Sequence, residues 1–168
     1  MAARLAKPVE PAAQPGVHQL PDEGVRPAAA GGPSVKKLVA TSCPCGSGRA
    51  YATCCGVYHQ GAAAPTAEAL MRSRYSAYAL GLEAYLLASW HPDTRPERFD
   101  LAEDAGRLKW IGLEIKATGQ GREADGVGTV EFVARYKVGG RAERMSETSR
   151  FERVAGRWVY RDGDVNDE

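Results

Sequence analysis

The four cysteines of this chain all fall within thirteen residues, at Cys43, Cys45, Cys54 and Cys55. Thiolates at the spacing C-x-C-x8-C-C can complete a tetrahedral metal site in which each Zn–S bond is about 2.3 Å long. A segment this short has no hydrophobic core of its own, so a bound ion would supply the free energy that folds it. Because the protein would fill all four ligand positions, the spacing predicts a structural site rather than a catalytic one.

The ligand chemistry favours zinc as the bound ion. Soft thiolates select zinc or iron, and iron tolerates the same tetrahedral set of four sulfurs, so zinc is preferred and iron stays an alternative. The Gly-Ser-Gly turn at 46–48 can direct backbone N–H groups at the sulfurs and spread their negative charge. His59 is near enough in the chain to replace one cysteine in a Cys3His site, which is a further alternative.

Two other uses of clustered cysteines are less favoured. Disulfides between neighbours, Cys43 with Cys45 or Cys54 with Cys55, would close small strained rings. Thioredoxin-type redox chemistry needs a C-x-x-C after a strand, which this spacing lacks. The chain also has no run of about 18 apolar residues and no apolar signal-peptide core. We therefore expect a soluble cytoplasmic protein, in a compartment that keeps thiols reduced.

The rest of the chain divides into a tail and a globular part. Residues 1–40 hold six of the ten prolines and show no repeating apolar period. Such a composition cannot offset the entropy cost of ordering it, so we predict a disordered tail. The chain has 22 Lys and Arg against 21 Asp and Glu. With so little net charge, no overall field draws it to nucleic acid or to a membrane.

From about residue 66 the pattern of apolar residues predicts an α+β domain. Helices are expected over 66–80, between Thr66 as N-cap and a C-terminal Gly81, over 82–89, and from a capping box at Thr94 to near Gly106. Strands are expected at about 108–117, 128–138, 142–154 and 157–163, with hairpin turns at 139–140 and 155–156. The third strand is polar on both faces, which predicts either an exposed edge or the wall of a cavity.

Cys43-Pro-Cys45-Gly-Ser-Gly, followed by Tyr51 and Cys54-Cys55, resembles the SEC-C motif, a small zinc module found on many bacterial proteins. Later segments resemble the middle domain of the YchJ-like family, which joins a SEC-C motif to a nuclear-transport-factor-2-like domain. The resemblance implies a zinc knuckle at 42–58 and, at 62–164, a cystatin-like α+β cone of helices on a curved antiparallel sheet. The matching segments are 71–78 (MRSRYSAY), 90–92 (WHP), 132–135 (FVAR), 149–151 (SRF) and 160–163 (YRDG).

Cones of this fold leave a concave cavity, and the resemblance implies candidate pocket residues. Residues two apart on a helix point about 200° apart, so Arg72 and Arg74 cannot both face one cavity. An enzyme would use His91 or Asp162 as its general base, whereas a purely structural interpretation makes His91 a helix end and pairs Arg150 with Glu147 or Asp162. Tyr78 or Tyr160 would then donate to an oxyanion, or simply pack in the core with Trp90. The full candidate set is Arg72, Tyr78, Trp90, His91, Arg150, Tyr160 and Asp162.

Three functions are open at this point. The first is a zinc-binding adapter, whose knuckle docks a protein or a ribosome-associated factor and whose cone is a scaffold or a small-ligand pocket. The second is a small-molecule enzyme working in the cone, and the third is metal sensing or storage. Many SEC-C motifs are lysine-rich between the cysteine pairs, whereas Arg49 is the only cation there in this chain. We therefore expect no strong nucleic-acid binding, and we assign no catalytic residue.

Overall fold

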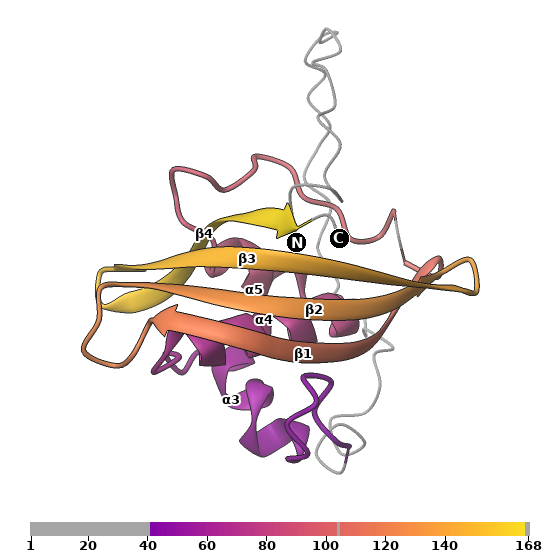
Figure 1. Ribbon diagram of the computed structural model, residues 1–168, viewed down its shortest axis with the longest axis horizontal. Coiled ribbons are helices and arrows are strands. Elements are labelled where there is room, and N and C mark those ends of the chain that lie inside the picture. The colour runs from indigo at the N-terminus through magenta and orange to yellow at the C-terminus, as the bar shows by residue number, and fades with distance from the viewer. Residues whose placement is uncertain (1–40, 104, 167–168) are drawn as a thin grey trace, which may run out of the picture.

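A computed structural model describes residues 41–103 and 105–166 of the chain (Figure 1). The tail predicted at 1–40 lies outside the described residues. Within the described part, no helix has both the length and the apolar character that crossing a membrane requires.

The described chain forms a cysteine-bearing segment, two longer helices and a four-stranded sheet. The strands form an antiparallel meander in the order β1-β2-β3-β4. Helices α4 and α5 lie against one face of the sheet, and the cysteine-bearing segment lies beside β1 (Figure 1). The predicted α+β class is confirmed. In chain order the elements are the 3-10 helix η1 (Tyr51–Thr53), α3 (Cys55–His59), α4 (Ala67–Leu80), α5 (Glu83–Ala88), β1 (Leu108–Gln120), β2 (Val127–Val138), β3 (Arg141–Val154) and β4 (Arg157–Asn166).

Helix α4 has the two ends that the sequence predicts. The Thr66 side chain accepts a hydrogen bond from the N–H of Ala69 at 3.1 Å, which satisfies one free donor of the first turn. Gly81 ends the helix in the left-handed region at a φ of 72°, where a side chain would be strained. α5 begins two residues later at Glu83, so the predicted second helix is confirmed as well.

The core lies between α4 and the inner face of the sheet. On β2 the side chains of Val130, Phe132 and Ala134 are fully buried, because alternate residues of a strand point to the same face. From the connection after α5, the Trp90 ring packs edge to face on the ring of Tyr160. Burying a large apolar side chain is worth about 1.5–3 kcal/mol. This layer therefore holds the helices on the sheet.

The third predicted helix is wrong: the described residues between Thr94 and Gly106 contain no helix. Instead of capping a helix, the Thr94 hydroxyl donates to the Arg161 carbonyl at 2.5 Å. The N–H of Leu101 donates to the Glu83 carboxylate at 3.2 Å, which ties this segment to α5. Phe99 and Leu101 are its only residues in the core layer, which is too few for the apolar stripe of a helix.

Strand β3 is an interior strand, so the exposed edge predicted as one alternative is wrong. It pairs with β2 on one side and with β4 on the other. Its polar inner face therefore lies inside the domain, where Glu147 is 0% and Ser149 1% exposed. The Ser149 hydroxyl donates to the Glu147 carboxylate at 2.8 Å, and the Tyr160 hydroxyl donates to the same oxygen at 3.4 Å. A buried carboxylate needs such donors.

A bulge on β4 decides which of its side chains face the core. Arg150 pairs with Asp162 while Phe151 pairs with Tyr160, so Arg161 is an extra residue in the ladder. Tyr160 is 4% exposed in the core, whereas the Asp162 side chain is 45% exposed. The two predicted hairpin turns are confirmed, and all four of their central residues have the positive φ that tight hairpins need.

Candidate metal centre

The four cysteine sulfurs converge in one buried cluster. All four Sγ atoms lie within 4.8 Å of one another, and no cysteine is more than 4% exposed. The first pair lies in a tight turn, closed by a hydrogen bond from the Cys43 N–H to the Arg49 carbonyl at 2.8 Å. Gly46 and Gly48 take left-handed φ values of 75° and 77° within it, which glycine adopts most readily. The second pair lies where η1 ends and α3 begins.

The sulfur positions fit a tetrahedral metal ion. Zn–S bonds at tetrahedral angles put ligand sulfurs about 3.8 Å apart, and the sulfurs of Cys45 and Cys54 are 3.6 Å apart. The thiols of Cys43 and Cys55 lower the pKa of Cys45, while those of Cys43 and Cys45 raise the pKa of Cys55. Neighbouring thiols can thus stabilise one thiolate, but four adjacent thiolates need a cation. The predicted residues could therefore hold a metal ion together.

His59 does not take part in the sulfur cluster. Its Nε2 lies 2.8 Å from the Ser73 carbonyl, which can only accept, so Nε2 carries the proton. Its Nδ1 then accepts a hydrogen bond from the Tyr51 hydroxyl at 2.7 Å. Both ring nitrogens are engaged, so the alternative of a Cys3His site is wrong. His59 instead ties α3 and η1 to α4.

Replacing His59 with alanine is expected to lower the stability by about 1–2 kcal/mol, because two hydrogen bonds are lost, and to leave the metal content unchanged. Burial lowers the pKa of His59 below its usual 6.5. Folding therefore favours the neutral form of His59. Its contribution to the free energy of unfolding is complete above the usual pKa and declines as the pH falls below it. Urea unfolding of both proteins across this range, with metal analysis, checks the prediction. Loss of the metal in the variant would contradict it.

Three polar side chains surround the sulfur cluster. The Ser47 hydroxyl, from the turn itself, lies 3.1 Å from the Cys54 sulfur. The Ser76 hydroxyl, from α4, lies 3.5 Å from the Cys43 sulfur. Arg72, also on α4, donates to the Cys45 carbonyl at 3.1 Å and to Glu68 at 3.0 Å. Arg72 thus lies at the cysteines and not in the interior of the cone, where the candidate set placed it.

Arg74 is the arginine that faces the interior. It is 3% exposed and donates to the Leu86 carbonyl at 2.8 Å and to the Ser89 hydroxyl at 2.7 Å. Its guanidinium carbon lies 5.1 Å from the centre of the Trp90 ring and 4.6 Å from that of Tyr160. Burial lowers the pKa of Arg74. Three of the predicted pocket residues lie around Arg74 in the core: Trp90, Tyr160 and Tyr78. Arg74 itself was not in the candidate set.

His91 lies between the end of α5 and β4. Its Nδ1 accepts the N–H of Asp93 at 3.1 Å, and its Nε2 lies 3.3 Å from the Glu152 carboxylate and 3.4 Å from the Arg161 guanidinium. Arg161 donates to the same carboxylate at 3.2 Å. His91 is 8% exposed and has partners on both ring nitrogens. This arrangement agrees with the structural interpretation of His91 given above.

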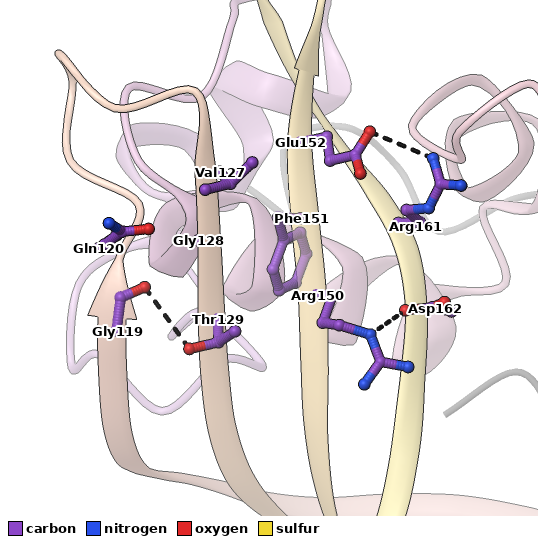
Figure 2. Close-up of a pocket in the computed structure, with 10 residues that line it drawn as sticks. All are labelled: Gly119, Gln120, Val127, Gly128, Thr129, Arg150, Phe151, Glu152, Arg161 and Asp162. Atoms are coloured by element: carbon purple, nitrogen blue, oxygen red, sulfur yellow. Dashed lines mark hydrogen bonds and ion pairs between the residues drawn. The ribbon is translucent and has the colours of Figure 1, made fainter.

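Arg150 and Asp162 lie on the outer face of the sheet, not in the interior. There Arg150 forms ion pairs with Asp162 and Asp164. Arg150 and Asp162 line a groove of about 490 Å³ whose lining residues come from all four strands and include Glu152 and Arg161. Figure 2 shows these side chains. The structure therefore divides the candidate pocket into three places: the cysteine turn, the core and this outer groove.

The sequence interpretation gave no role to Ser47 and Ser76, although both were within segments singled out for other reasons. A hydroxyl beside a sulfur leaves no spacing signal of its own. Ser76 lies four residues after Arg72 and so on the same face of α4, but the sequence did not indicate that this face meets the cysteines.

Comparisons with known proteins find two matches to family models in this chain. Residues 41–56 match the SEC-C motif, and residues 66–163 match the family described as YchJ, middle NTF2-like domain. A UPF0225 protein of Chromobacterium violaceum is 64% identical over 130 residues, which cover 76% of this chain and 96% of that protein. A UPF0225 protein of Streptomyces coelicolor is 55% identical over 126 residues, covering 74% and 96%.

Two solved structures resemble this one. The solution structure of a SEC-C motif containing protein from Rhodopseudomonas palustris has a TM-score of 0.66 at 34% identity, and the match covers 76% of this chain and 100% of that one. The crystal structure of a SEC-C motif containing protein from Psychrobacter arcticus has a TM-score of 0.64 at 27% identity, covering 79% and 86%. The domain after the cysteines therefore has the nuclear-transport-factor-2-like fold.

Proposed function

Because this chain belongs to the YchJ-like family, in which a SEC-C motif precedes a nuclear-transport-factor-2-like domain, we propose that it is a zinc-binding adapter protein. One Zn²⁺ would be held by the four cysteines, a partner would dock on the folded knuckle, and the cone would be its scaffold. The closed sulfur cluster carries this proposal, since four buried protein ligands leave the ion no open position for a substrate. Iron in the same cluster is the alternative, and metal analysis distinguishes the two.

We assign the partner to the exposed side of the knuckle, residues 46–50. Gly46, Gly48, Arg49 and Ala50 are exposed there, over a backbone that the metal would hold rigid. Phosphate binding needs several cations, and this surface offers one. A protein, whether free or associated with the ribosome, is therefore favoured as the partner over RNA.

Capture of a partner by the metal-loaded full-length protein tests the proposal. The tagged wild type and the variants Cys54→Ser and Arg49→Glu are compared in lysate of the bacterium from which the protein comes. Lys137→Glu is the matched control, because Lys137 is an exposed cation on β2, outside the knuckle. The same partner is expected with wild type and Lys137→Glu, and its loss is expected with the other two, as identified by mass spectrometry. Equal recovery with Cys54→Ser would contradict the proposal.

The enzyme alternative draws less support from these side chains. The Asp162 carboxylate is 45% exposed and paired with Arg150, so it is half of a surface ion pair and does not lie in an enclosed site. The Nδ1 of His91 already accepts a backbone N–H. Metal storage or sensing draws less support as well, because metal exchange requires access to the sulfurs, and all four cysteines are buried.

A further inference from the structure

Helix α4 presents polar groups to the cysteine cluster on one side only. Arg72 and Ser76, four residues apart, both reach it. The carbonyl of Ser73, on the same side, accepts the hydrogen bond from His59. Arg74 and Tyr78, also four residues apart, face the core of the cone instead. Helix α4 therefore contacts both the cysteine-bearing segment and the core of the cone.

The Ser76 hydroxyl is used differently from that of its neighbour on the helix. A serine inside a helix commonly donates back to a carbonyl one turn earlier, as Ser73 does to Leu70 at 2.8 Å. Ser76 is 0% exposed, and its hydroxyl lies 3.5 Å from the sulfur of Cys43. When that sulfur is a thiolate it can only accept, so the hydroxyl donates to it.

A four-thiolate site needs such donors for its charge. Four thiolates around a divalent ion leave two negative charges, and burying uncompensated charge is costly. Ser47 supplies one hydroxyl from within the turn, and Ser76 supplies another from α4. The guanidinium of Arg72 adds a positive charge at the Cys45 carbonyl. Part of this compensation thus comes from the cone.

We infer that α4 completes the metal centre, with Ser76 acting as a positioning residue for the thiolates and Arg72 supporting it. The SEC-C segment of this protein is then not a self-contained module, and retention of its ion depends on the domain that follows. Linkage makes the dependence reciprocal: if α4 stabilises the bound ion, the ion stabilises α4. This inference rests on the metal centre proposed above and is independent of any docking partner.

Zinc release from the full-length protein tests the inference. The zinc-loaded protein is mixed with the chromogenic chelator 4-(2-pyridylazo)resorcinol, and the rate of transfer is followed. Loss of a group that orients metal ligands typically costs about 10–100-fold in affinity, so Ser76→Ala is expected to release zinc at least about tenfold faster. Arg72→Met should also accelerate release, and it supplies the test if Ser76→Ala does not fold.

Ser73→Ala is the matched control. It removes a fully buried hydroxyl from the preceding turn of α4. This hydroxyl contacts Leu70 and Tyr85 but no sulfur. It is expected to lower the melting temperature and to release zinc at the wild-type rate. In the Co²⁺-loaded proteins, Ser76→Ala should shift the sulfur-to-cobalt charge-transfer band to longer wavelength, because a thiolate without its hydrogen bond gives up electrons more easily. Ser73→Ala should leave the band in place.

The outcomes separate this inference from the proposed function. A wild-type protein that binds no zinc would overturn the metal centre itself. A wild type that holds zinc, with an unchanged release rate and cobalt band in Ser76→Ala, would overturn only the role of α4. Equal acceleration by Ser73→Ala would do the same, because the effect would then reflect general loosening of the helix.

Discussion

Removal of the bound metal ion is expected to unfold the cysteine-bearing segment while the sheet stays folded. The apolar cluster of this segment consists of the four cysteines and Tyr51, so without the ion the segment has no apolar core of its own. Structural zinc sites in small modules contribute apparent binding free energies of about 10–16 kcal/mol at pH 7. The cone has its own core and does not need the ion to keep it. Hydrogen exchange should show lost protection over residues 43–59, after chelation or in Cys45→Ser, with β2 and β3 still protected.

The control for this loss is Thr53→Ala. Thr53 is exposed in the same segment, and its hydroxyl donates to the Ala50 carbonyl at 3.2 Å without touching a sulfur. This variant should keep one metal ion per chain and full protection. In wild type, all four thiols should resist alkylation until the ion is removed. Free reaction of the native thiols, or an unchanged exchange pattern after chelation, would contradict the structural role of the metal.

Truncation of Arg74 is expected to cost about 3 kcal/mol of stability or more, the range for large core truncations. Alanine at this position removes the hydrogen bonds from Arg74 to the Leu86 carbonyl and the Ser89 hydroxyl. Hydrogen bonds to a charged group contribute about 1.5–3 kcal/mol each. It also leaves a gap beside the rings of Trp90 and Tyr160, both of which the guanidinium contacts. Urea unfolding of the zinc-saturated protein measures the change.

Arg72→Ala is the comparison that makes this result specific. Arg72 lies on the same helix, but its side chain is 27% exposed and paired with the partly exposed Glu68. Pairs of this kind contribute about 0–1 kcal/mol. With zinc saturating, Arg72→Ala should therefore be much the milder of the two variants. If it destabilised the protein as much as Arg74→Ala, the assignment of Arg74 to the core would be wrong.

The regular elements could be predicted because local patterns determine them. The caps Thr66 and Gly81 mark the ends of α4, and the period of two on β2 marks its buried face. The clustering of the four cysteines could be predicted as well, since they lie close together in the sequence as well as in space. The third helix failed because a capping-box pattern at Thr94 was not followed by an apolar stripe.

The candidate pocket could not be predicted because side-chain direction there depends on tertiary structure. A regular strand would put Tyr160 and Asp162 on one face, and the extra residue Arg161 puts them on opposite faces. On α4, helical geometry separates Arg72 from Arg74 but does not say which one faces the cone. That choice follows from the position of the cysteine segment beside β1, which no local pattern in the sequence encodes.

The order of the elements along the chain bears on how the protein is made. The four cysteines precede the four strands of the sheet, and these strands pair only with their neighbours in sequence. The proposed metal site could therefore form as soon as Cys55 has left the ribosome, and each hairpin can close as it emerges. The helix that carries Ser76 is synthesised between these two stages. The ion would then be bound with full affinity only after the sheet has formed and that helix is packed beside the sulfurs.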